Sequence, residues 1–173
     1  MTRRPAALAT SAVALLTFGL LSSCSSFDDS STVASVGDHE LGRDEFEAIA
    51  RNPAVSAPSE EPPTTVTGDT ARSIIGAWVN VYVLEDAGVL EDVTDEQARA
   101  YLDSAPQLAG WDTDDEAVRF ILDLAKLSLL IENGAIDPAE ANDLRAQADV
   151  HVSSRYGVWD PAQGVVPLGA QSE

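Results

Sequence analysis

Cysteine, histidine and positive charge are scarce in this sequence. It contains one cysteine, two histidines and ten lysine and arginine residues, against 29 aspartate and glutamate residues. One cysteine excludes an internal disulfide and a cysteine-rich zinc module. A net charge of −19 repels the phosphate backbone, which proteins bind through clustered lysine and arginine, so nucleic acid is not an expected partner. A length of 173 residues fits one soluble domain with short attachments.

The common enzyme motifs are also missing. The sequence has no Gly-x-Ser-x-Gly nucleophile turn and no glycine-rich phosphate loop. If the extended runs around them pair, His39, Glu40 and His151 offer a weak metal site. Neighbours along a strand point to opposite faces, however, so His39 and Glu40 diverge, and surface histidines are the expectation. The sequence therefore predicts no enzyme activity, no cofactor and no metal centre.

The N-terminus has the pattern of a secretory leader. Two arginines at positions 3 and 4 precede a charge-free apolar run over 6–21, which is shorter than the about 20 residues of a membrane-spanning helix. The run ends in Leu21, Ser22, Ser23 and Cys24, which match a bacterial lipobox whose cysteine receives diacylglycerol. The sequence predicts a signal peptide over 1–23 and an extracytoplasmic protein anchored to the membrane through Cys24. The alternative is an ordinary signal peptide with an incidental cysteine.

Hydrophobic periodicity predicts a mainly α domain over 33–161. We expect helices over 43–51, 69–87, 94–104, 114–132 and 137–148. Asp69 or Thr70 is expected to cap the second of these helices, and capping boxes beginning at Thr94 and Thr113 are expected to open the third and fourth. The fourth helix is apolar around most of its circumference, which is typical of a central buried helix. Its charged residues Arg119, Asp123 and Lys126 argue against a membrane span.

Two short β-type runs lie at opposite ends of this domain. They are Val33–Val36 and Val150–Val152, and we expect them to pair in a small antiparallel sheet that closes the helical domain. A lipidated polar tether over 24–32 precedes the domain, and a flexible tail over 162–173 follows it. A proline-containing loop is expected from Asn52 to Gly68.

The acidic residues favour ordinary surface roles. The group at 112–116 lacks the glycine and the ligand spacing of a calcium loop, whereas acids in a first helical turn are favoured by the helix dipole. The pairs Glu85-Asp86 and Glu91-Asp92 are expected to be solvated.

Five aromatic residues are candidates for either the core or a client-binding groove. They are Trp78, Tyr82, Trp111, Tyr156 and Trp159. The core is the favoured interpretation, because large rings bury much apolar area, and a peptide-binding groove is the alternative.

Two segments, residues 33–46 (VASVGDHELGRDEF) and residues 150–161 (VHVSSRYGVWDP), lie at the two ends of the predicted domain. The first resembles the opening strand and helix, and the second the closing segment, of the N-terminal domain family of the chaperone SurA, in actinobacterial lipoproteins of that type. The resemblance implies an extracytoplasmic chaperone that binds unfolded client segments. Members with prolyl isomerase activity carry a parvulin domain, and nothing in this sequence resembles one.

Two functions follow as alternatives. The first is a membrane-anchored, chaperone-like module that binds unfolded or exported polypeptides and lacks an isomerase domain. The second is a structural or adaptor lipoprotein that docks one folded cell-envelope partner. A concave exposed apolar patch beside mobile segments favours the first, and a flat, rigid patch with a polar rim favours the second.

Overall fold

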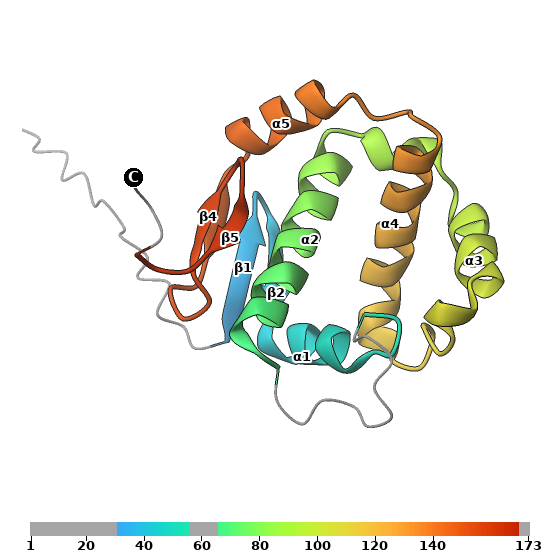
Figure 1. Cartoon of the computed structure of the whole chain (residues 1–173), viewed down its shortest axis with the longest axis horizontal. Helices are drawn as coiled ribbons and strands as arrows, with labels where there is room; N and C mark the ends of the chain where they lie inside the picture. Colours follow the sequence, from blue (N-terminus) through green and yellow to red (C-terminus); the bar gives the residue numbers. More distant parts are fainter. Residues whose placement is uncertain (1–30, 56–65, 170–173) are drawn as a thin grey trace, which may run out of the picture.

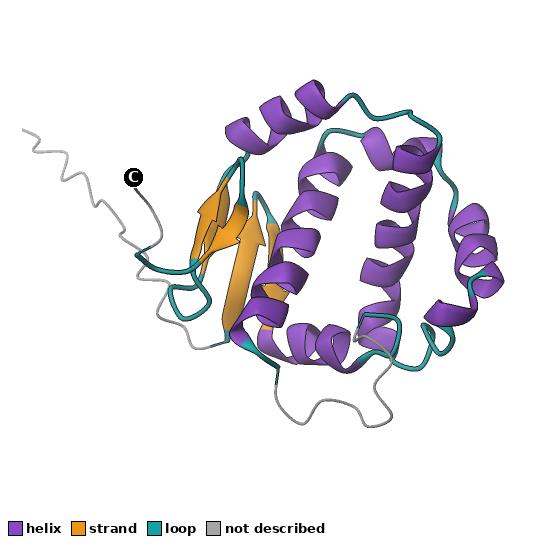
Figure 2. Cartoon of the chain, in the orientation of Figure 1, coloured by secondary structure: helices purple, strands orange, loops and turns teal. Residues whose placement is uncertain are grey.

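Five α-helices and two small antiparallel sheets form the part of the chain that a computed structural model describes, residues 31–55 and 66–169 (Figure 1). The domain is mainly helical, as the sequence predicts, and Figure 2 shows the strands gathered at one side of the helices. The predicted signal peptide, the lipobox with Cys24 and most of the tether lie outside the described residues. So does the 56–65 part of the predicted loop.

The larger sheet has three strands in the order β2-β1-β3. Strand β1 spans Thr32–Val36, β2 spans His39–Gly42 and β3 spans Val150–Val152. Both neighbours are antiparallel to β1, so that Ala34 lies opposite Leu41 on one side and Val152 on the other. These three side chains are buried, which gives the sheet one apolar face toward the helices.

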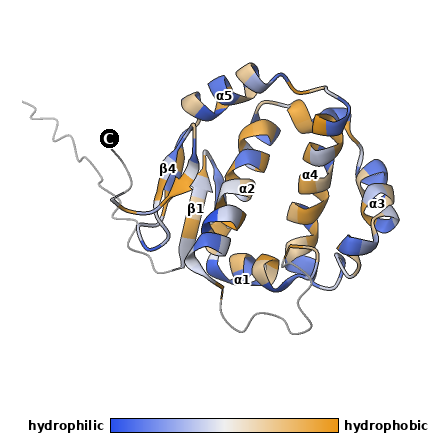
Figure 3. Ribbon diagram, in the orientation of Figure 1, coloured by the Kyte–Doolittle hydropathy of each residue, from blue (hydrophilic) through white to orange (hydrophobic). Residues whose placement is uncertain are grey.

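Helices α1 and α2 pack on this sheet, and α4 packs on both of these helices. The three helices span Arg43–Arg51, Gly68–Asp86 and Asp115–Glu132. Figure 3 shows hydrophobic residues along both α2 and α4, which lie side by side. The core between them includes Ile75 and Trp78 from α2 and Phe120 from α4, all almost fully buried. Asn52 directly follows α1, and its side chain donates to the carbonyl of Trp111 at 2.9 Å. The first residue of the predicted loop is therefore a buried part of the core.

Helix α4 differs from its prediction as a fully buried helix. Phe120, Ile121 and Leu122 are buried, but Ile131 in the last turn is 62% exposed. Asp123, a charged residue, is buried instead. The apolar residues of α4 therefore exceed what its buried face uses. Within 31–55 and 66–169, no helix combines the length and hydropathy that crossing a membrane requires.

Helices α3, Asp95–Ser104, and α5, Pro138–Gln147, complete the helical part. Two short 3₁₀ turns, η1 over Val89–Asp92 and η2 over Pro106–Leu108, flank α3. The predicted capping box at Thr94 is confirmed, because its hydroxyl accepts from Gln97 N while Gln97 Oε1 accepts from Thr94 N. Two caps are shifted from their predicted positions: Thr67 caps α2, and Asp114 caps α4. Thr67 lies two residues before Asp69 and Asp114 one residue after Thr113, because several neighbouring side chains have equally suitable oxygens.

The C-terminal segment forms a hairpin where the sequence predicts a flexible tail from residue 162. Strand β4, Val158–Asp160, pairs antiparallel with β5, Gly164–Val166, and Val165 is buried against the core. Gly157 begins the hairpin with φ +147°, and a Cβ there would lie 2.2 Å from the carbonyl oxygen of Val166. Only glycine permits this approach.

Candidate functional site

An apolar groove of about 520 Å³ lies between α2, the end of α4 and α5. We call it the α2–α4–α5 groove. It is lined by Asn80, Leu84, Leu127, Ile131, Gly134, Ile136, Pro138, Ala141 and Arg145. Its volume falls within the range of about 300–1,000 Å³ of sites that hold a ligand.

Helical spacing places these side chains on facing surfaces. Asn80 and Leu84 are four residues apart on α2, as are Leu127 and Ile131 on α4, so each pair lies on one side of its helix. Gly134, with φ +66°, follows the end of α4 in the left-handed conformation that turns the chain toward α5. The groove is thus formed by the last turns of two core helices and covered on one side by α5.

Helix α5 is attached weakly compared with the other α-helices. It has no buried residue, whereas α1, α2, α3 and α4 each have at least two. Its contacts with the core come from half-buried residues, among them Ala141 and Leu144. Elements with few buried apolar contacts open at low free-energy cost. The wall that α5 provides can therefore adjust to what the groove holds.

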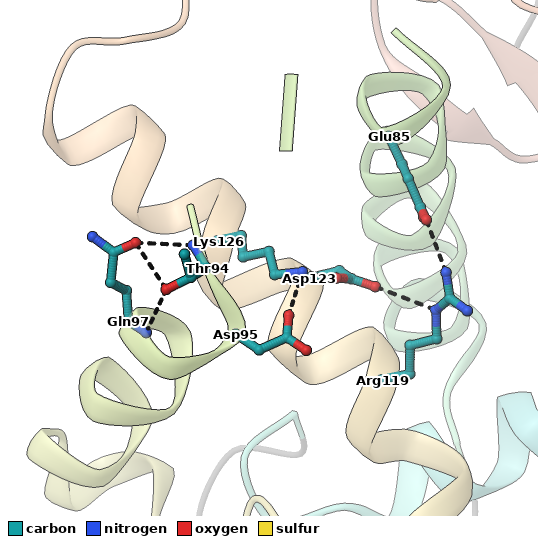
Figure 4. Close-up of polar contacts among 7 residues, drawn as sticks. All are labelled: Glu85, Thr94, Asp95, Gln97, Arg119, Asp123 and Lys126. Atoms are coloured by element: carbon teal, nitrogen blue, oxygen red, sulfur yellow. Dashed lines mark hydrogen bonds and ion pairs between the residues drawn. The ribbon is translucent and has the colours of Figure 1, made fainter. Parts of the chain in front are cut away.

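A second site, which is polar, lies where α2, α3 and α4 meet (Figure 4). The ammonium of Lys126 lies 2.6 Å from Asp95 Oδ1 and 3.0 Å from Asp123 Oδ1. Arg119 Nη2 donates to Glu85 Oε1 at 2.8 Å, and its Nε lies 3.8 Å from Asp123 Oδ2. We call these five residues the interhelical ion cluster; they border a cleft of about 420 Å³.

Burial and ion pairing shift the pKa values of two carboxyl groups of this cluster in opposite directions. Burial raises the pKa of Asp123, whose side chain is 8% exposed. The hydrogen bond from Lys126 lowers the pKa of Asp95. Each cation here already has a carboxylate partner, so the cluster joins three helices rather than presenting a free acid or base. The sequence predicts Glu85 to be solvated. In the structure this residue of α2 is half-buried and accepts a hydrogen bond from Arg119 on α4.

The two histidines lie on opposite faces of the sheet. His39 pairs with Val36, and its ring lies 4.6 Å from that of Tyr82, with Nε2 3.0 Å from Asp86 Oδ1. Asp86 is exposed, as the sequence predicts, and is also a partner of His39. His151 pairs with Ser35, the next position along β1, and therefore points the other way. Among the described residues, no group of three or more histidine, cysteine or acidic side chains is placed to hold a metal ion.

The five candidate aromatic residues lie in or against the core. Trp78, Tyr82 and Trp111 are buried. Tyr156 and Trp159 are half-buried, and the ring of Tyr156 lies 5.4 Å from that of Phe46 on α1. The groove lining is mostly aliphatic and contains none of the five.

The sequence patterns did not predict the residues that line the groove. The available signal was the excess of apolar residues on α4, which a single buried face cannot accommodate. The fold and the site together define a mainly helical domain with an aliphatic surface groove. Comparisons with models of protein families, with curated proteins and with solved structures find no match for this chain.

Proposed function

We propose that the protein is a membrane-anchored extracytoplasmic lipoprotein whose domain binds apolar segments of unfolded, exported polypeptides. The observation that carries this proposal is the α2–α4–α5 groove with its exposed apolar residue Ile131. The proposal includes no prolyl isomerase activity, in keeping with the lack of any parvulin-like segment in the sequence.

The groove has the properties that a site for varied apolar segments requires. Its aliphatic walls offer contact without directional hydrogen bonds, so many side chains are accepted. An amphipathic helix or an extended segment places two or three apolar side chains in such a groove. The weakly attached α5 lets the width change from one client to another. A concave site of this kind favours the chaperone-like function over the docking of one folded partner.

The acidic surface supports the same function. Removal of residues 1–23 would leave eight basic residues against 29 acidic residues. A strongly charged carrier stays soluble while it covers an aggregation-prone segment. The same charge is repelled by anionic headgroups, so membrane attachment depends on the lipid at Cys24. We expect Cys24→Ser to release the protein from membranes, and retention of the cleaved variant in the membrane fraction would contradict the anchor.

The groove is tested with a pair of matched substitutions. Ile131 and Leu168 are the two exposed large hydrophobic residues of the described chain, at 62% and 65%, and Leu168 lies outside the groove. Light scattering of a refolding client measures the suppression of aggregation. We expect Ile131→Asp to lose this suppression, because it places a charge in the groove, and Leu168→Asp to retain it.

Two outcomes would overturn the proposal. If the unaltered protein leaves scattering unchanged at several-fold molar excess, the adaptor function replaces the chaperone-like one. If Ile131→Asp suppresses aggregation as well as Leu168→Asp does, the groove is not the binding site. A proline-limited refolding reaction, measured in parallel, is expected to keep its rate.

A further inference from the structure

Arg145 is the one cationic side chain that lines the α2–α4–α5 groove. It lies in the last turn of α5, four residues beyond Ala141, and therefore on the same side of the helix. Its Nε donates to the carbonyl of Ala141 at 3.3 Å, and its Nη2 donates to the side-chain oxygen of Asn142. Both acceptors are uncharged and belong to α5 itself.

Among the described residues, Arg145 shares this lack of a carboxylate partner with Arg43, Arg99 and Arg155. Four other cations of the domain have a carboxylate within 4 Å: Arg51, Arg72, Arg119 and Lys126. Two more, Arg99 and Arg155, lie over aromatic rings. Among the described residues, no carboxylate lies within ion-pair distance of Arg145. A half-buried guanidinium at the edge of an apolar groove is therefore left with its charge uncompensated by the protein.

The chemistry of this position indicates an anionic ligand group. A guanidinium presents a planar fork that binds a carboxylate through two hydrogen bonds. Arg145 also lies near the negative end of the α5 dipole, which favours a cation at this position. Arg145 is the one charged residue that lines the groove, so it is the lining residue to which a carboxylate would bind most favourably.

We propose that the groove selects apolar segments that carry an aspartate or glutamate side chain, which Arg145 binds at the α5 edge. The inference rests on the proposed function and adds to it both a preferred sequence and a direction. The aliphatic residues of the segment lie between α2 and α4, and its acidic residue lies against the last turn of α5. The carboxylate contact thus fixes which way the segment runs.

The test uses three fluorescent peptides with one shared aliphatic core. In the first, one flanking residue is glutamate and the C-terminus is amidated. In the second, glutamine replaces that glutamate. In the third, glutamine is kept and the C-terminus is a free carboxylate. Binding to the chain from residue 24 onward, carrying Cys24→Ser, is measured by fluorescence anisotropy, and each peptide is made with the flanking residue on either side of the core.

Of the two glutamate peptides, we expect the one whose glutamate lies on the side of the core that reaches Arg145 to bind about tenfold more tightly than its glutamine counterpart. This ratio is that of a charge-assisted hydrogen bond. Arg145→Gln is expected to abolish this ratio, and Arg155→Gln, which removes the same charge outside the groove, is expected to keep it. The ratio remains readable if Arg145→Gln also weakens α5, because both peptides then lose affinity equally.

Three results would overturn the inference. They are equal affinities for the glutamate and glutamine peptides, a preference that survives Arg145→Gln, or a preference confined to the free C-terminal carboxylate. If the peptides bind equally well, only the carboxylate preference is lost. If none of them binds, the proposed polypeptide-binding function fails as well, so the two failures are distinct.

Discussion

Replacing Gly157 with alanine should break the packing of the C-terminal hairpin. The new Cβ would lie 2.2 Å from the carbonyl oxygen of Val166 and 3.2 Å from Cγ1 of Val165. The oxygen belongs to the backbone of β5, so it cannot move aside as a flexible side chain could. Relief of the contact requires β5 to separate from β4, in which Val158 pairs with Val166.

The expected cost has two parts. A non-glycine residue at such a φ costs about 1–3 kcal/mol. Displacement of β5 exposes Val165, which is 9% exposed in the folded domain, and loss of one buried aliphatic side chain costs about 1.5–3 kcal/mol. We therefore expect Gly157→Ala to lower the free energy of unfolding by about 4 kcal/mol.

Gly164 supplies the matched control within the same hairpin. Its φ is +84°, but a Cβ there meets no atom within 4 Å. Gly164→Ala should therefore cost only the conformational part, about 1–2 kcal/mol. Urea unfolding followed by tryptophan fluorescence measures both variants. Equal losses for Gly157→Ala and Gly164→Ala would refute the described hairpin packing.

Three further predictions concern the helices and their ionisable groups. Burial raises the pKa of Tyr82 to about 12, so the unfolded chain releases the phenol proton at a lower pH than the folded protein does. The free energy of unfolding should therefore fall by about 3 kcal/mol as pH rises from about 10 to 12. Urea titrations at each pH measure this loss, and Tyr82→Phe should remove it. Because burial raises the pKa of Asp123, the folded state takes up a proton on this carboxyl at a higher pH than the unfolded chain does. The unaltered protein should therefore gain stability relative to Asp123→Asn as pH falls from 7 toward 4. A relative loss of stability would contradict the burial of this carboxyl. Thr94→Ala removes the capping box of α3 and should cost about 1 kcal/mol by the same urea assay, with no cost expected if the box does not form.

Local signals in the sequence were enough to place the helices. The capping box at Thr94, Asp137 followed by Pro138 and glycine after α2 each act within a few residues, so the bounds of α3, α5 and α2 agree with prediction to within one or two positions. The predicted strand Val150–Val152 is present for the same reason.

The hairpin and the groove depend on contacts between distant segments, and local patterns do not contain them. Strands β4 and β5 form a separate sheet in which each has only the other as a partner, and the reason for Gly157 lies at Val166. The ion pair of Lys126 with Asp95 depends on the packing of α3 against α4, so the sequence pattern of α4 does not predict it. The groove likewise appears only when α5 is placed across α2 and α4.

The pairing of β1 with β3 sets the order in which a newly made chain can finish folding. Strand β1 emerges from the ribosome early with β2 as its only neighbour, and a two-stranded hairpin is marginally stable by itself. Its second edge stays open until β3, which follows all five helices, has been synthesised. A prematurely terminated chain therefore keeps an unpaired strand edge, which invites proteolysis or aggregation. Only a chain that includes Val152 can therefore complete the three-stranded sheet.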